Sequence, residues 1–100
     1  MRRRIPSISS LMAFDAAARH TSIPRAADEL ALTESAVSRQ ISQLEGQLGV
    51  QLFHRIKKRL SLTRAGVAYA RDVAASLERL EKNTFDVMSG EGRGGTLEIA

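Results

Sequence analysis

Two short apolar stripes in the middle of this chain constrain its fold more than any other feature. Both recur at the three- and four-residue spacing of an amphipathic helix. They consist of Ile23, Ala26, Ala27 and Leu30, and of Val37, Ile41, Leu44 and Leu48, and we expect the second set to form the buried side of its helix. Residues 31–33 alone separate them. Two short helices joined this tightly, the second polar on its outer face, are typical of a helix-turn-helix that reads DNA.

Hydroxyl-bearing residues precede each predicted helix and can cap its free N–H groups. The predicted N-caps are Ser7, Ser22, Thr33 and Thr63, for helices over about 8–20, 23–30, 34–47 and 64–88. Pro24 falls in the first turn of the second helix, where its missing N–H removes no intrahelical bond. Gly49 is well placed to end the third helix.

The outer face of the third predicted helix is polar and carries small hydroxyl groups around one arginine. Its members are Glu34, Ser35, Ser38, Arg39 and Ser42. Small side chains let a helix approach the floor of a DNA groove closely, and an arginine can bind two acceptor atoms of one guanine. A surface helix that is merely hydrated would show the same polarity, so this face alone does not settle the function.

A short basic hairpin is predicted after the third helix. Strands at 52–55 and 60–62 would be joined by residues 56–59. The segment from 52 to 64 contains no acidic residue, and its cations are Arg55, Lys57, Lys58, Arg59 and Arg64. A hairpin with basic residues at its tip is the wing of a winged helix-turn-helix, although a solvated basic loop would have the same composition.

The charge balance favours a polyanionic partner, and the composition argues against an enzyme. Lysine and arginine number 15 against 11 acidic residues, a net charge of +4, and residues 2–4 are all arginine. Cysteine is absent, the two histidines are His20 and His54, and no carboxylate cluster has metal-ligand spacing. We therefore expect neither a catalytic nor a metal site. No segment approaches the ~18 apolar residues of a membrane span.

The fourth predicted helix carries an apolar seam at heptad spacing. The residues expected to form a dimer interface are Ala70, Val73, Leu77, Leu80 and Val87. At about 1.5 Å per residue the helix spans roughly 38 Å, more than the small core beneath it can cover. The seam is therefore expected to meet a second copy of the chain, or alternatively a further domain of the same chain. A protein-docking module without DNA would explain this helix but not the basic hairpin.

A glycine-rich segment at 90–95 follows this helix and matches GxGxxG by letter. We reject a dinucleotide site, because a helix precedes the segment and a strand-like segment follows it, which reverses the required order. The sequence predicts a mainly α protein with four parts. These are a winged helix-turn-helix over 1–63, a linker helix over 64–89, a hinge over 90–95 and the start of a missing effector-binding domain over 96–100.

Taken together, several motifs resemble the amino-terminal part of the LysR-type transcriptional regulators. They are Ser22–Ala27, Ala36–Ile41, Leu44-Glu45, Leu48–Val50, Leu52-Phe53, Arg55 and Leu62–Gly66. The segments Ile5-Pro6 and Phe14–His20 are similar to the branch that contains the glycine-cleavage and beta-lactamase regulators. The resemblance covers nearly the whole chain.

The resemblance implies a bacterial, cytoplasmic regulator that acts on the nucleoid through double-stranded DNA. It implies a homodimer through the linker helix, a tetramer in the full-length protein, and an operator with an interrupted inverted repeat. It also implies that a small-molecule effector binds a carboxy-terminal domain. No cofactor and no membrane partner are expected for residues 1–100.

The resemblance further places the start of the third helix in the major groove. The positions that match groove or base contacts are Thr33, Glu34, Ser35, Ala36, Ser38 and Arg39. Backbone or wing contacts are expected from Arg25, Ser42, His54, Arg55, Lys57, Lys58 and Arg59.

Two departures from the family pattern leave individual roles open. Many members carry Gln then Pro where this chain has Glu34 and Ser35, and the wing often has glycine where Arg59 stands. Glu34 can accept from cytosine N4 or sit back from the phosphates, and Arg39 can bind guanine or clamp a phosphate. The added cation at position 59 favours a phosphate or minor-groove contact.

Overall fold

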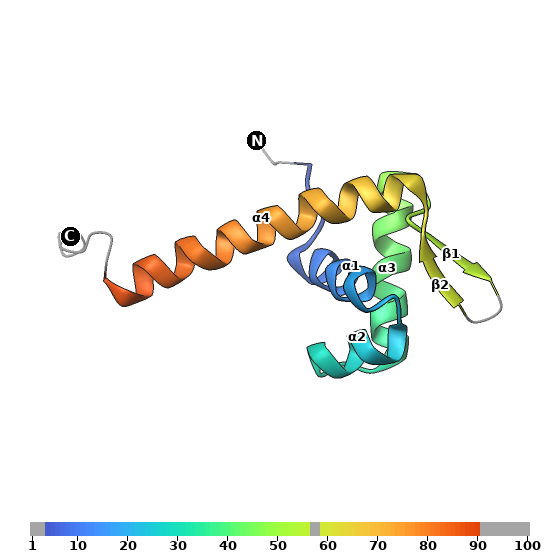
Figure 1. Cartoon of the computed structure of the whole chain (residues 1–100), viewed down its shortest axis with the longest axis horizontal. Coiled ribbons are helices and arrows are strands. Elements are labelled where there is room, and N and C mark those ends of the chain that lie inside the picture. The colour runs from blue at the N-terminus through green and yellow to red at the C-terminus, as the bar shows by residue number, and fades with distance from the viewer. Residues whose placement is uncertain (1–3, 57–58, 91–100) are drawn as a thin grey trace.

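The computed structural model describes residues 4–56 and 59–90, in which four α-helices and one antiparallel hairpin follow one another. The elements are α1 (Ile8–His20), α2 (Ile23–Leu30), α3 (Glu34–Leu48), β1 (Phe53–Ile56), β2 (Arg59–Leu62) and α4 (Arg64–Ser89) (Figure 1). This order confirms the predicted mainly α architecture, with a hairpin wing and a long final helix. Within the described residues, no helix combines the length and the apolar character needed to cross a membrane.

All four predicted N-caps are confirmed. Each cap oxygen accepts a hydrogen bond of 2.9–3.2 Å from the backbone N–H three residues later, at Ser7, Ser22, Thr33 and Thr63. Ala31, between α2 and α3, has a φ of 57°, and this left-handed conformation lets Leu32 N–H donate to the Ala27 carbonyl at 3.0 Å. Gly49 ends α3 with a φ of 70°. These helix ends set the short connections and therefore the angles between helices.

The core forms where the three short helices, the start of the hairpin and α4 meet. Its buried members are Ala13, Phe14, Ala16, Ala17, Ala26, Ala27, Val37, Ile41, Leu44, Leu52, Phe53 and Val73. The ring of Phe14 packs against Phe53 edge-on, with 5.6 Å between ring centroids, and lies equally far from Tyr69 of α4. The expectation that Leu48 is buried is wrong. It is 36% exposed, because it lies in the last turn of α3, past the final core residue Leu44.

The hairpin differs from the prediction at both strands. Ile56 pairs with Arg59, so the first strand is shifted by one residue and the second begins one residue earlier. Lys57 and Lys58, which connect the strands in the sequence, lie outside the described residues. Leu52 precedes β1 instead of belonging to it, and it is buried. The other pairs in the register are Phe53 with Leu62, His54 with Ser61 and Arg55 with Leu60.

The first half of α4 packs against the chain's own core, and the second half extends past it (Figure 1). Val73 is 5% exposed, and Ala70 and Leu77 are partly buried against the core. The expected contact with a second copy is corrected for Val73, because its side chain is buried in its own chain. For Ala70 and Leu77, which keep part of their surface exposed, that contact stays a prediction. Leu80 and Val87 are 50% and 74% exposed.

The end of α4 coincides with the start of the predicted hinge. Gly90 closes the helix with a φ of 74°. The rest of the hinge, the predicted domain start at 96–100, and the arginines at positions 2 and 3 lie outside the described residues. The division into domains therefore stays a prediction.

Candidate nucleic-acid interface

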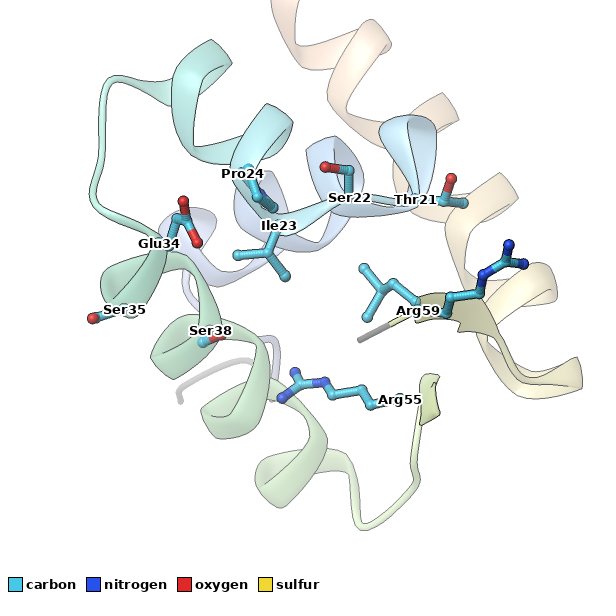
Figure 2. Close-up of a pocket in the computed structure, with 10 residues that line it drawn as sticks. Thr21, Ser22, Ile23, Pro24, Glu34, Ser35, Ser38, Arg55 and Arg59 are labelled. Atoms are coloured by element: carbon cyan, nitrogen blue, oxygen red, sulfur yellow. The ribbon is translucent and has the colours of Figure 1, made fainter. Parts of the chain in front are cut away.

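A groove of about 930 Å³ opens between the start of α2, the start of α3 and the hairpin (Figure 2). We call it the α3–wing groove. Its lining residues are Thr21, Ser22, Ile23, Pro24, Glu34, Ser35, Ser38, Arg55, Arg59 and Leu60. Five of these belong to the predicted DNA-contact set, and they come from two elements that are distant in the sequence. The fold therefore brings three of the six predicted helix contacts (Glu34, Ser35 and Ser38) close to two of the predicted wing contacts (Arg55 and Arg59).

The amino-terminal part of α3 forms one wall of the groove. Thr33 holds the helix start, because its Oγ1 accepts a hydrogen bond from Ala36 N–H at 3.0 Å. Glu34 and Ser35 are exposed in the first turn, and Ser38 is half-buried one turn later. This wall thus presents short polar side chains and one carboxylate at the end of the helix where the positive end of its dipole lies.

The two described basic residues of the hairpin point to opposite sides. Alternation along β1 places Arg55 on the same face as Phe53, and its cross-strand partner Leu60 shares that face. The Arg55 side chain reaches toward α3, whereas the Arg59 guanidinium is turned away from α3 (Figure 2). Arg59 shares the outer face with its partner Ile56. Both arginines line the groove, but only the Arg55 guanidinium is directed toward α3.

The remaining predicted contact residues within the described chain do not line the groove: Arg25, Thr33, Arg39, Ser42 and His54 are exposed, and Ala36 is half-buried. Arg39 follows Ser38 by about 100° around the helix, which directs it to the open side of α3. His54 lies on the outer face of the hairpin, opposite Ser61. The structure therefore divides the predicted set into groove-lining residues and residues on the surfaces beside the groove.

The start of α2 lines the groove, although Thr21–Pro24 are not among the residues predicted to contact DNA. Thr21–Pro24 lie in the wall next to the hairpin residues Arg55 and Leu60. Ser22 caps α2 and Pro24 fills its first turn, which marks a helix start where free backbone N–H groups favour anions. The sequence therefore indicates that a helix starts here, but the position of this helix start beside the wing depends on the tertiary fold.

An ion-pair network joins the end of α1 to α2. Arg19 donates to both carboxylate oxygens of Glu29 and, through Nε, to Asp15 at 3.1 Å. His20 Nε2 lies 2.8 Å from Glu29 Oε1. The Arg19 guanidinium, and after it His20, lowers the pKa of Glu29 from 4.5 to about 2, and Glu29 raises the pKa of Arg19. The network helps to hold the orientation of the first two helices.

A buried polar link joins α1 to α3. Ser10 is 4% exposed, and its hydroxyl donates to Gln40 Oε1 at 2.9 Å. Because the hydroxyl has a partner, its burial costs little.

Burial also raises the pKa of Tyr69. In the described residues, His, Asp and Glu side chains do not gather in groups of three that could hold a metal ion.

Comparison with known proteins finds the same arrangement elsewhere. A family model described as "Bacterial regulatory helix-turn-helix protein, lysR family" matches residues 8–67. The glycine cleavage system transcriptional activator of Escherichia coli (strain K12) is 42% identical over 94 residues, which cover 94% of this chain and 31% of that protein. Its homolog in Haemophilus influenzae is 46% identical over 84 residues, covering 84% and 28%. The chain thus spans about a third of the length of these relatives.

A solved structure shares the fold. The BenM DBD/catB site 1 DNA complex matches with a TM-score of 0.79 at 26% identity, and the match covers 84% of this chain and 93% of that chain. Because nearly all of that chain is matched, the helices and the hairpin of the two proteins are arranged alike.

Proposed function

This chain belongs to the lysR family of bacterial regulatory helix-turn-helix proteins, and from that premise we propose that it is the sequence-specific DNA-binding part of a transcriptional regulator. The relatives named above are activators of transcription and not enzymes, and the structural neighbour is described as a complex with DNA. The proposed partner is double-stranded DNA.

The observation that carries the proposal is the α3–wing groove. It sets the polar start of α3 beside a hairpin arginine, since Ser38 and Arg55 line the same groove. The major groove of B-DNA is about 12 Å wide and admits a helix, and the phosphates on either side of it attract cations. We infer that the start of α3 enters the major groove while Arg55 contacts the adjacent sugar-phosphate backbone.

Base reading is assigned to the exposed side of α3. Arg39 is proposed to bind O6 and N7 of a guanine, a contact worth about 1–3 kcal/mol of discrimination. Glu34 is proposed to accept from N4 of a cytosine, because a carboxylate placed against a phosphate would be repelled. The remaining groove contacts are assigned to Thr33, Ser35, Ala36 and Ser38.

Backbone contacts are assigned to the cations and polar residues around that helix. They are Arg25, Ser42, His54, Arg55 and Arg59. Such contacts hold the register of the protein on the duplex without reading its sequence. A dimer that neutralises 6–10 phosphates would bind roughly 10³–10⁵-fold more weakly in 200 mM salt than in 50 mM salt.

We propose that two copies associate through the second half of α4. Large apolar side chains that are 50–79% exposed lie there, namely Leu80, Phe85, Val87 and Met88. Exposed apolar residues at helical spacing are typical of a surface that a partner covers. A two-fold dimer would bind an interrupted inverted repeat whose half-sites lie about one helical turn, or a multiple of it, apart.

The location and the effector follow from the same proposal. A DNA partner places the protein on the nucleoid in the bacterial cytoplasm. Because the chain spans about a third of its relatives' length, we assign the binding of a small-molecule effector and the assembly of dimers into tetramers to residues outside 1–100. We assign no cofactor to residues 1–100.

Selection of bound sequences from a random duplex pool tests this function. We expect an enriched sequence with dyad symmetry. Arg39→Ala should lower the preference at one base pair of each half-site by about 1–3 kcal/mol. The matched control Arg71→Ala, exposed on the first half of α4 and outside the proposed DNA contacts and dimer segment, should keep the full preference. A selected pool without any common sequence would contradict sequence-specific DNA binding. An unchanged base preference in Arg39→Ala would show that Arg39 does not contact a base.

A further inference from the structure

Glu45, near the end of α3, holds the start of the hairpin with one carboxylate oxygen. Its Oε2 accepts hydrogen bonds from the backbone N–H groups of Leu52 at 2.8 Å and Phe53 at 3.1 Å. Both donor residues are 1% exposed, and Glu45 is half-buried. A buried N–H that loses its acceptor costs about 1–3 kcal/mol, so this contact constrains where the hairpin begins.

Glu45 also lies on the side of α3 that faces the groove. It follows Ser38 by seven residues, or two helical turns, so the two side chains share a face about 10 Å apart along the axis. Ser38 lines the α3–wing groove together with Arg55, which is two residues beyond Phe53 in β1. A displacement at the Glu45 contact would therefore move Arg55 relative to Ser38.

The same backbone segment is held to α4 by different contacts. The Leu52 carbonyl accepts from Thr63 N–H at 3.0 Å, and Thr63 Oγ1 donates to the Gln51 carbonyl at 2.8 Å. Gly66 packs so closely that a Cβ there would lie 2.1 Å from the Leu52 oxygen. These contacts fix the segment to α4, whereas the Glu45 side chain ties it to α3.

We propose that Glu45 is a positioning residue that sets the distance between α3 and the hairpin, and with it the place where Arg55 meets the DNA backbone. The inference rests on the proposed function. Because a single oxygen accepts both hydrogen bonds, the amide oxygen of Gln can take its place. The Asp side chain is one methylene shorter and loses the reach. The role therefore requires length and an acceptor rather than a negative charge.

The first measurement needs no DNA. Amide hydrogen exchange at Leu52 and Phe53 should become about tenfold faster, or more, in Glu45→Asp and Glu45→Ala, and stay near the wild-type rate in Glu45→Gln. Glu45→Asp is the deciding variant, because it keeps the charge and removes only one methylene group. Gln47→Ala, on an exposed position of the same helix, serves as the control and should leave both amides unchanged. Unchanged exchange in Glu45→Asp would overturn the proposal.

The second measurement is a double-mutant cycle on the selected duplex. Glu45→Asp should weaken binding about tenfold, and Arg55→Ala should then add less than about threefold, because the arginine has already lost its position. Arg39→Ala should keep its full separate effect in the same background. Independent, fully multiplying effects of Glu45→Asp and Arg55→Ala would refute the positioning role. Failure of the wild type to bind duplex would refute the proposed function instead, and the exchange measurement would still decide the Glu45 contact.

Discussion

The two halves of α4 share one helix and one apolar seam, yet their surroundings differ. In residues 64–77, Gly66 and Val73 are buried, and Leu77 is partly buried against the core. In residues 78–89, the exposure of the large apolar side chains rises from 50% at Leu80 to 79% at Met88. Figure 1 shows this second half extending beyond α1.

The difference teaches that helical spacing identifies an apolar stripe without identifying what covers it. The first half meets its own core, because Gly66 lets α4 lie directly on the backbone at Leu52. Past Leu77, the described part of the chain leaves the stripe exposed. This contrast supports association of two copies through residues 78–89 and not through the whole seam.

Placing the same charge in each half is the most severe test of the contrast. Val73→Asp should destabilise the fold by roughly 3–5 kcal/mol, because an unpaired carboxylate would enter the core. Val87→Asp, the matched substitution at a position that is 74% exposed, should change the free energy of unfolding by less than about 0.5 kcal/mol. Thermal unfolding followed by circular dichroism measures both. Equal losses in the two variants would abolish the distinction between the halves.

Val87→Asp also tests whether two copies associate through the second half of α4. Combined with Leu80→Asp, Val87→Asp should yield folded monomers at concentrations where the wild type sediments as a dimer, because like charges would meet in the interface. Dimers that persist in this variant would place the interface on another surface.

Glycine substitutions test why the first half of α4 packs against the core. Gly66→Ala would set a Cβ 2.1 Å from the Leu52 oxygen, and we expect it to cost about 1–3 kcal/mol. Gly46→Ala, in α3 with nothing within 4 Å of the new carbon, should instead stabilise the fold by up to about 1 kcal/mol, because alanine favours helix. Urea unfolding curves measure both values. Stabilisation by Gly66→Ala would rule out the close approach of α4 to Leu52.

The smallest contrast is between two ion pairs, one that joins α1 to α2 and one on the exposed second half of α4. Glu29→Gln removes the negative charge paired with Arg19 and one of the two acceptor oxygens, and it should cost about 1 kcal/mol at neutral pH. Asp86→Asn, which breaks the 3.2 Å pair with Lys82 on the exposed half, should cost less than about 0.5 kcal/mol. Chemical unfolding at pH 7 compares the two, and an equal cost for both would show that the Glu29 network adds nothing beyond a surface pair.

The pH dependence of stability follows from the same network. The pKa of Glu29 is lowered from 4.5 to about 2 in the folded protein. Ionised Glu29 therefore stabilises the fold above about pH 4.5, and this contribution is lost as the pH falls toward 2. Between these values, the stability of Glu29→Gln should decline less steeply than that of the wild type.

Local features could be predicted because they depend on residues a few positions apart. Each N-cap acts on an N–H three residues later, so the starts of the four helices follow from spacing alone. The family resemblance rests on similarly local motifs. It is confirmed by the match over residues 8–67 and by the 42% identity to a glycine cleavage activator.

The wrong predictions concern contacts between residues far apart in the sequence. Leu48 fits the apolar period of α3 but lies past the end of the core, and Val73 fits the seam but faces its own chain. Glu45 belongs to one of the family motifs, but nothing in the sequence indicates its contact, because its donors are backbone N–H groups that nearly every residue possesses. The start of α2 carries a cap signal, but nothing local places it beside the wing.

By itself the sequence determined where the helices begin and end, that a basic hairpin follows a helix-turn-helix, and to which family the chain belongs. Caps, periodicity and turn residues act over one or two helical turns, so they can be identified in a single chain. The tertiary structure decided that Ser38 and Arg55 share a groove, that the Arg59 guanidinium is turned away from α3, and that the first half of α4 packs against the core. Strand register and the extent of neighbouring elements control these outcomes, and no local pattern specifies either.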